Sequence, residues 1–357
     1  MLHAPTLGEL LTAAARTAGA APAFRYDDET LSFADWNELA DKVAARLFAA
    51  GVRRGDVVAL WLPSTPLYQM AYLGAARLGA ATTGINIRYR RLEAGHVLRQ
   101  SGAKVLLAVD RWHGCEIRDV VDSLRSELDE LADVFWFSCD ELRSGTRRTV
   151  ERFARDCVPA PDQPVRSTDP AAIVFTSGTT GVPKGACYAH RNILALAEIE
   201  TRRYPDGQIP FEKHLAAGLS FAHVGTMARI GIQLAHAGLS ILHDSFDPGR
   251  VLEEIERERL YHLGGIPTQI IMLLDHPDRP RRDLSSLRSI LLGGAASSPT
   301  LIRRIAATFT ATISVRYSST EVGIATASLP DDPLEFLLET VGKPTPGVEL
   351  RIVDADN

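Results

Sequence analysis

The feature that most constrains the fold of this chain is a repeated alternation of short apolar runs with stretches of helical periodicity. Residues 36–50 carry apolar side chains at helical spacing and follow Ser32 and Asp35, a pair that suits a helix start. An apolar run at 56–62 is then closed by Pro63, as expected for a buried strand. The order continues with predicted helices at 68–78 and 92–101 and predicted strands at 80–87 and 104–109. This alternation predicts an α/β fold, in which parallel sheets are covered by helices on both faces.

A proline-rich stretch divides the alternation into two series. Pro159, Pro161 and Pro164 lie close together and indicate a linker near residue 165. After them come predicted strands at 171–175, 240–243, 262–265, 287–292 and 312–317, and predicted helices at 192–200, 248–259, 299–309 and from 268 onward. A chain of 357 residues suits about two domains at ~150 residues each. We therefore expect two doubly wound, mostly parallel α/β subdomains at 1–165 and 166–340.

Residues 176–185, TSGTTGVPKG, directly follow the predicted strand 171–175. Ligands of open parallel sheets bind at the carboxyl ends of strands. Glycines allow backbone N–H groups to surround phosphate oxygens, hydroxyls add donors, and Lys184 adds a positive charge. A Walker A loop needs Gly and Lys side by side and then Ser or Thr, whereas Lys184 lies between Pro183 and Gly185. The segment predicts a phosphate-binding loop of another kind.

Bulk composition excludes several other classes of protein. Hydrophobic residues make up 45% and charged residues 23%, and the net charge of -5 gives no reason to expect nucleic acid or an anionic membrane as partner. The one dense basic cluster, at 279–282, is interrupted by Pro280 and suits a solvated loop. The four cysteines form no CxxC pair and are expected to be free thiols. Neither a signal peptide nor a membrane span is visible, so we expect a cytoplasmic protein.

The decamer 176–185 resembles the signature loop of the adenylate-forming superfamily, which contains acyl-CoA synthetases, peptide-synthetase adenylation domains and luciferases. Residues 315–321, VRYSSTE, resemble the second motif of that family, although Ser318 stands where the family has glycine. Residues 293–299, GGAASSP, resemble the adenine-side segment, and 221–223, FAH, resemble the segment beside the acyl pocket. The likeness begins near residue 6, includes 31–39, and keeps the family's order and spacing to the end of the chain.

The resemblance implies roles for particular residues. The expected nucleotide contacts are Thr176, Ser177, Gly178, Thr179, Thr180, Gly181, Lys184, Gly294, Ala295, Ala296, Arg316, Tyr317, Ser318 and Thr320. Thr179 and Glu321 would hold Mg²⁺, a cation that prefers oxygen ligands. The expected catalytic residues are Lys184, His223, Thr320 and Glu321, and the expected acyl contacts are His223, Val224, Thr226, Met227 and Ile266. The side chain of Ser318 should cause a local adjustment of the backbone.

The function implied is that of an AMP-forming acid-thiol ligase. Such an enzyme joins a carboxylic acid to ATP, releases pyrophosphate, and passes the acyl group to coenzyme A. The resemblance favours an aliphatic, fatty-type acid and leaves aromatic or alicyclic acids open. It also leaves open a homodimer, an acyl-AMP ligase that serves a carrier protein, and a nucleotide-binding module without catalysis. A P-loop kinase is disfavoured by the spacing around Lys184.

The resemblance also implies elements that this sequence does not contain. The family continues with an aspartate that binds ribose, a hinge, and a small C-terminal domain that carries a lysine. We expect residues 341–357 to begin a truncated third β subdomain. A chain without those elements should be poorly active on its own, although it could still bind nucleotide. Pyrophosphate exchange at a normal rate by this polypeptide would contradict that expectation.

Overall fold

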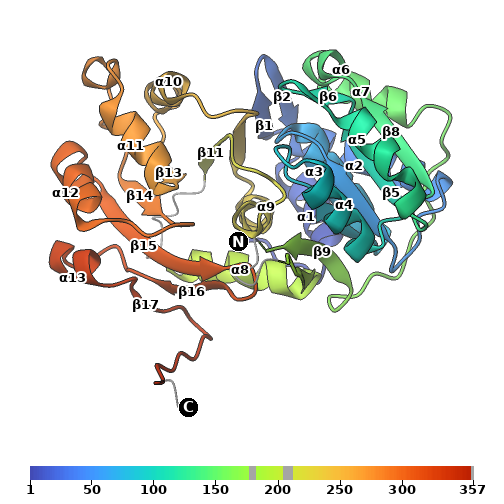
Figure 1. Ribbon diagram of the computed structural model, residues 1–357. Helices are drawn as coiled ribbons and strands as arrows, with labels where there is room; N and C mark the ends of the chain where they lie inside the picture. Colours follow the sequence, from blue (N-terminus) through green and yellow to red (C-terminus); the bar gives the residue numbers. More distant parts are fainter. Residues whose placement is uncertain (177–181, 204–211, 355–357) are drawn as a thin grey trace. The chain divides into compact units, whose positions relative to one another are not determined.

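The computed structural model describes residues 1–176, 182–203 and 212–354 (Figure 1). The chain divides into two compact units, and each is described here by itself. The first unit contains residues 1–197 and 218–244, and the second contains 198–217 and 245–357.

The first unit is built around a six-stranded sheet of order β10-β9-β4-β3-β5-β8. These strands are β3 (Val57–Trp61), β4 (Ala81–Gly84), β5 (Val105–Val109), β8 (Asp133–Phe137), β9 (Pro170–Phe175) and β10 (Gly185–Ala189). The first five of these are parallel to their neighbours, and only β10 is antiparallel, at one edge beside β9. The predicted parallel, helix-covered sheet is therefore present.

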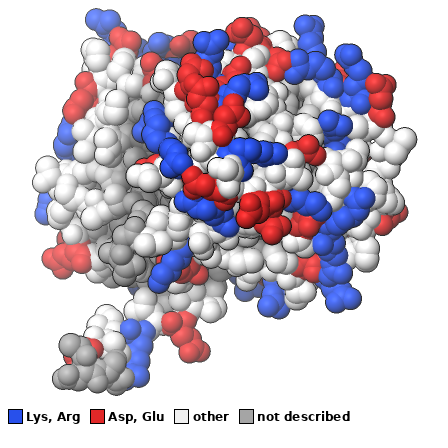
Figure 2. All heavy atoms as spheres, turned by 45° about the vertical axis from the view of Figure 1, so that its right-hand side comes forward, with Lys and Arg blue, Asp and Glu red and all other residues white. Residues whose placement is uncertain are grey.

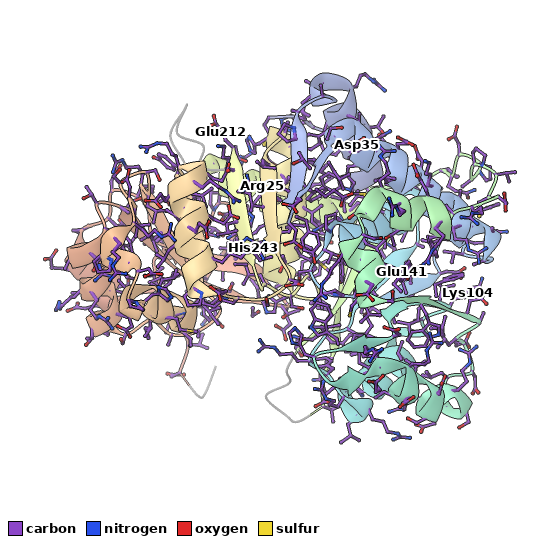
Figure 3. The ribbon with its side chains drawn as sticks, turned by 90° about the horizontal axis from the view of Figure 1, so that it is seen from above. Arg25, Asp35, Lys104, Glu141, Glu212 and His243 are labelled. Atoms are coloured by element: carbon purple, nitrogen blue, oxygen red, sulfur yellow. The ribbon has the colours of Figure 1, made fainter. Side chains whose placement is uncertain are left out.

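Helices pack against this sheet or against one another. They are α1 (Leu7–Ala18), α2 (Phe33–Ala49), α3 (Pro66–Arg77), α4 (Arg91–Ser101), α5 (Ile117–Leu124), α6 (Cys139–Arg143), α7 (Thr146–Phe153), α8 (His190–Arg202) and α9 (Val224–His236). Ser32 and Asp35, the latter labelled in Figure 3, form the capping box that begins α2, as the sequence predicted. Helix α3 packs against α1, α2 and α7, and every residue from Pro66 to Ala76 is buried.

Three further strands of the first unit belong to a separate small sheet. Strand β1 (Pro22–Tyr26) pairs in parallel with β12 (Leu239–His243) and antiparallel with β2 (Glu29–Ser32). Only β12 was predicted from the sequence. Parallel pairing of β1 with β12 brings the beginning of the chain beside residues more than 200 positions later. Strands β6 (Arg111–Trp112) and β7 (Cys115–Glu116) make a short hairpin.

The second unit contains a five-stranded sheet of order β13-β14-β15-β16-β17. The second unit includes the elements β11 (Lys213–Ala217), α10 (Pro248–Glu258), β13 (His262–Gly265), α11 (Pro267–Asp275), β14 (Ser289–Leu292), α12 (Pro299–Thr308), β15 (Thr312–Ser319), β16 (Gly323–Ala327), α13 (Leu334–Glu339) and β17 (Lys343–Pro344). Strands β13, β14 and β15 are parallel, and β16 and β17 extend the sheet in antiparallel fashion.

The boundaries of the units differ from those expected from the sequence. The proline-rich stretch precedes β9, which pairs with β4 through Thr82 and Thr83 and so belongs to the sheet of the first unit. A proline cluster marks a surface connection, but hydrogen bonding between strands decides which unit a segment joins. Likewise Lys343 in β17 pairs with Ala327, so this part of 341–357 extends the sheet of the second unit.

The surface bears charges of both signs. Basic and acidic side chains are intermixed on the face that Figure 2 shows. All four cysteines are free, as predicted. None of the helices in the described residues combines the length and apolar character needed to cross a membrane.

Candidate active site

The phosphate-loop candidate connects two hydrogen-bonded strands. Thr176 follows β9, and its backbone N–H donates to the carbonyl of Lys184 at 2.9 Å. The N–H of Lys184 donates in turn to the Oγ1 atom of Thr176 at 3.4 Å. The loop therefore begins at the carboxyl end of a parallel strand, as predicted, and Lys184 is exposed at its base. Five predicted contacts lie outside the described residues: Ser177, Gly178, Thr179, Thr180 and Gly181.

A histidine that was not among the predicted site residues supports the loop. His96 in α4 lies 2.7 Å from the carbonyl oxygen of Pro183 through Nε2, and its ring packs edge-on against Phe175 at 5.9 Å. These contacts join α4 to both sides of the loop. The residues are 79 or more positions apart, so no local pattern could have revealed the contact.

The amino end of β9 is held by an ion pair. The Arg54 guanidinium donates two hydrogen bonds to the Asp169 carboxylate, from Nε at 2.8 Å and from Nη2 at 2.6 Å, and the backbone N–H of Arg166 donates a third at 2.8 Å. These donors, Arg54 foremost, lower the pKa of Asp169 to about 2. The loop that ends β9 is thus carried by a strand fixed at its other end.

His190 has a structural role in the first unit. It is fully buried, and its Nδ1 accepts a hydrogen bond from the backbone N–H of Leu7 at 3.3 Å. Burial lowers the pKa of His190 to about 4, so the ring is neutral at neutral pH.

His223 is the N-cap residue of α9. Its Nδ1 accepts a hydrogen bond from the backbone N–H of Gly225 at 3.2 Å. This contact requires the tautomer in which Nε2 carries the proton. Desolvation lowers the pKa of His223, although the residue keeps an exposed surface. His223 is therefore a neutral hydrogen-bond donor, a form suited to binding a carboxylate.

The other acyl candidates of the first unit lie in the first turn of α9. Val224, Thr226 and Met227 are buried, and the hydroxyl of Thr226 donates to the carbonyl of Ser220 at 2.6 Å. Thr226 therefore presents mainly its methyl group for further packing.

The segment before α9 packs closely on the main sheet. The rings of Tyr68 and Phe221 are 5.4 Å apart. A Cβ atom at Gly84 would lie 2.5 Å from Cα of Ala222, so only glycine allows β4 to approach this segment. The close approach fixes the backbone at Ala222, the residue that precedes His223.

In the second unit, the GGAASSP segment follows β14. Gly294 has a φ of +78°, and Gly294, Ala295 and Ala296 are exposed. A Cβ atom at Gly294 would lie 3.2 Å from Cγ2 of Ile266, so the predicted adenine-side segment and the predicted acyl residue Ile266 are neighbours.

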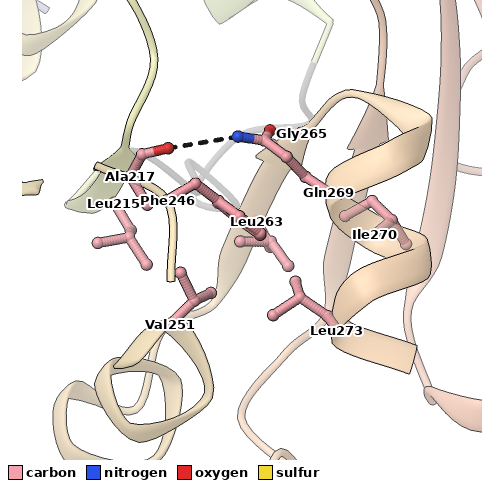
Figure 4. A pocket seen from close by; sticks show the side chains of 10 residues that line it. Leu215, Ala217, Phe246, Val251, Leu263, Gly265, Gln269, Ile270 and Leu273 are labelled. Atoms are coloured by element: carbon pink, nitrogen blue, oxygen red, sulfur yellow. Dashed lines mark hydrogen bonds between the residues drawn. The ribbon is translucent and has the colours of Figure 1, made fainter. Parts of the chain in front are cut away.

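Gln269 was not among the predicted site residues, but its side chain positions Ile266. Its Oε1 accepts from the backbone N–H of Ile266 at 3.3 Å, and its Nε2 donates to the carbonyl of Ala217 at 3.4 Å (Figure 4). Gln269 also lines an apolar cavity with residues such as Leu263 and Leu273. The cavity volume of about 10 Å³ is close to the minimum for one water molecule, so it is a packing gap and too small for an acyl chain.

The second family motif forms the end of β15 and the turn into β16. Tyr317 is 51% exposed, which leaves a ring face available for stacking. The pairing register shifts between Tyr317 and Ser318, and Ser318 pairs with Ile324 outside the left-handed φ region. The pairing of β15 with β16 is thus irregular at this serine, as in a β-bulge. Thr320 is half-buried and Glu321 is exposed in the turn.

Arg316 belongs to a buried charged cluster. Its Nη2 pairs with Glu200, which also pairs with Arg203 at 3.2 Å. Burial alone would raise the pKa of Glu200, but Arg316 and Arg203 hold it below its ordinary value. The guanidinium of Arg316 is therefore engaged inside the second unit.

The described residues offer few ligands for a metal ion. No group of three or more His, Cys, Asp and Glu side chains in 1–176, 182–203 and 212–354 could hold one. Glu321 and the neighbouring hydroxyls of Ser319 and Thr320 are oxygen donors. Such a set fits Mg²⁺, which keeps water molecules and is bound by one or two carboxylates together with substrate phosphates.

The fold and these strand-end segments agree with comparisons to known proteins. The chain belongs to the family of AMP-binding enzymes, which matches residues 11–357. It is homologous to acyl-CoA ligases, and its fold is that of the N-terminal domains of adenylate-forming enzymes. The sequence resemblance and the fold class expected from it are confirmed.

Among the relatives is the 3-[(3aS,4S,7aS)-7a-methyl-1,5-dioxo-octahydro-1H-inden-4-yl]propanoyl:CoA ligase of Mycobacterium tuberculosis (strain ATCC 25618 / H37Rv), 35% identical over 326 residues. The match covers 89% of this chain and 63% of that ligase, so the chain spans less than two thirds of its length. The inhibitor-bound N-terminal domain of FACL13 from Mycobacterium tuberculosis has a TM-score of 0.83 at 26% identity, over 96% of this chain and 82% of that one. The anthranilate CoA ligase AuaEII in complex with anthranoyl-AMP has a TM-score of 0.86 at 22% identity, over 98% of this chain and 66% of that one.

Proposed function

We propose that this chain binds ATP and a carboxylic acid and supports formation of an acyl adenylate with release of pyrophosphate. In the whole protein, transfer of the acyl group to coenzyme A would follow. The observation that carries the proposal is the family match over residues 11–357, combined with Lys184 and Thr176 at the carboxyl end of β9.

The chemistry brings together two anions, the acid carboxylate and the α-phosphate of ATP. Positive charge and oriented donors should therefore supply most of the catalysis. Lys184 provides the charge, and the loop from Thr176 to Lys184, with Ser177, Gly178, Thr179, Thr180 and Gly181, provides hydroxyl and backbone donors. Thr320 is proposed as a further donor to the reacting oxygens.

The nucleoside is assigned to the second unit. Tyr317 is proposed to stack on adenine, and Gly294, Ala295 and Ala296 to line its edge. All four are exposed: the three small residues follow the end of β14, and Tyr317 lies near the end of β15. Arg316 and Ser318 adjoin Tyr317, and their proposed contacts with the nucleotide run through the backbone of β15.

Mg²⁺ is proposed to be held by Glu321 and Thr179. When bound, it would neutralise phosphate charge. His223 is proposed to donate its Nε2 proton in a hydrogen bond to the acid carboxylate. Val224, Thr226, Met227 and Ile266 are proposed to contact the acyl chain.

For the acid itself, we propose an aliphatic, fatty-type chain, because the buried side chains of Val224 and Met227 are apolar. The relative from Mycobacterium tuberculosis is named for a bicyclic propanoyl group, so a ring-bearing propanoic acid is the second candidate.

Two measurements test the proposal. ATP binding by this chain is measured by calorimetry with Mg²⁺ present. Acid-dependent pyrophosphate release by the whole protein is followed with a panel of aliphatic and alicyclic acids, with and without coenzyme A. Binding of ATP that is strengthened by one class of acid supports the proposal and identifies the substrate class. Absence of ATP binding at millimolar concentration would refute it.

A further inference from the structure

A second hollow of the second unit lies apart from the residues proposed to bind ATP and the acid. Its volume is about 490 Å³, within the ~300–1,000 Å³ range of small-molecule sites. Its walls include three arginines, Arg279, Arg282 and Arg288, and the segment Thr308–Thr310, in which two threonines flank Phe309. Part of this set is the basic cluster that the sequence suggested to be a solvated loop.

The arginine-lined hollow lies at the amino-terminal edge of the sheet. Arg288 directly precedes β14, and Thr310 precedes β15 by two residues. The nucleotide contacts proposed in the second unit lie near or after the opposite ends of the same strands. Because β14 has four residues, at ~3.3 Å per residue its two ends are about 13 Å apart. A ligand in the hollow would thus occupy a site distinct from that of the nucleotide.

The charge in the hollow is only partly balanced. Arg282 pairs with Glu256 at 2.9 Å. Arg279 donates from Nε to the carbonyl of Leu274 at 2.9 Å, and Arg288 donates to the carbonyl of Thr310 at 3.5 Å. In the part of the chain that the structure describes, neither Arg279 nor Arg288 forms an ion pair. Two positive charges therefore remain on the walls after Arg282 is neutralised by Glu256.

We propose that this hollow binds a phosphate monoester group. Such a group carries about -1.5 to -2 charges at pH 7, which matches the two arginines without a carboxylate partner. Guanidinium groups form paired, charge-assisted hydrogen bonds with phosphate oxygens. The Thr310 side chain, exposed at the rim, adds a hydroxyl, and buried Phe309 closes one wall. The phosphate could belong to a free metabolite or to a phospholipid headgroup, and the two sources share this chemistry.

Calorimetric titration with glycerol 3-phosphate tests the proposal. A Lys184→Ala background removes the lysine proposed to bind ATP phosphates, so the remaining binding reports on the hollow. Arg279→Gln/Arg288→Gln is expected to weaken binding at least tenfold. Arg281→Gln is the matched control, because its side chain is 81% exposed, pairs with Asp278 and does not line the hollow. It should change the dissociation constant less than twofold.

Arg288→Gln alone guards against a folding defect. Among the residues that the structure describes, this exposed side chain makes one long hydrogen bond, to the carbonyl of Thr310. It should retain the unfolding midpoint and weaken binding about threefold or more. Sedimentation with phosphatidic acid or phosphatidylcholine vesicles distinguishes the two sources. Capture by phosphatidic acid that needs Arg279 and Arg288 identifies a headgroup, and glycerol 3-phosphate binding without capture identifies a free ligand. Equal binding by the double variant and Arg281→Gln, or binding to neither probe, would overturn the proposal.

Discussion

The ion pair between Arg54 and Asp169 gives a prediction that can be worked from the structure. Asp169 is 9% exposed, and its pKa is about 2 compared with an ordinary 3.8. That difference corresponds to about 2 kcal/mol of stability at neutral pH, at ~1.36 kcal/mol per pKa unit. Arg54 is 35% exposed, so solvent screens the pair and the realistic range is about 1–2 kcal/mol. We expect Asp169→Asn to lower the free energy of unfolding of the first unit by that amount.

The effect has a defined pH dependence. The folded pKa is depressed, so the stabilisation is complete above pH 5 and is lost as pH falls from the unfolded value toward 2, with about half gone by pH 3. Urea unfolding followed by tryptophan fluorescence measures it. All four tryptophans lie in the first unit, at positions 36, 61, 112 and 136.

A double-mutant cycle of Asp169→Asn with Arg54→Gln isolates the pair. Because the cycle subtracts the single-mutant effects, the titration of nearby His190 cancels to first order. Asp133→Asn is the control, since Asp133 is exposed at the start of β8 and should cost less than about 0.5 kcal/mol. A coupling energy near zero at pH 7, or one that stays constant down to pH 3, would refute the reasoning.

Three further predictions concern the binding site and its surroundings. Lys184→Ala should weaken ATP binding at least tenfold in calorimetry. The control Lys42→Ala removes a surface lysine paired with Glu38 and should leave ATP binding unchanged. Equal effects of the two variants would argue against contact between Lys184 and the phosphates. His223→Asn should keep the helix cap and the unfolding midpoint while weakening acid binding several-fold. His223→Ala should weaken acid binding as well and should also cost about 1 kcal/mol of stability, because the cap is lost. Unaltered acid affinity in both variants would show that His223 does not contact the acid. His190 is protonated near pH 6.5 in the unfolded chain and near pH 4 in the folded chain, so the free energy of unfolding should fall as pH drops from 6.5 to 4. Urea midpoints measured over this range should fall less steeply in His190→Gln. An unchanged dependence on pH would contradict the lowered pKa of His190.

The sequence predicted most of the regular elements that carry the candidate site. The helix that became α2 was visible because Ser32 and Asp35 cap it, and β3 because an apolar run ends at Pro63. Strands β1 and β2 were missed, since their residues mix polar and apolar side chains and gain stability from pairing with each other and with β12. Strand β10 was missed because the glycine-rich loop obscured the residues after it, and its pairing with β9 appears only in the fold.

The sequence by itself determined the class of fold and the family. Both depend on local patterns: the period of apolar residues, and short motifs in which glycine, hydroxyl and lysine side chains have fixed spacing. Only the tertiary structure decided that β9 belongs to the first unit, that His96 supports Pro183, and that Arg279 and Arg288 face a common hollow. It also decided that Gln269 holds Ile266 through the backbone. These are contacts of single side chains whose partners are chosen by packing, and such contacts leave no periodic signal in the chain.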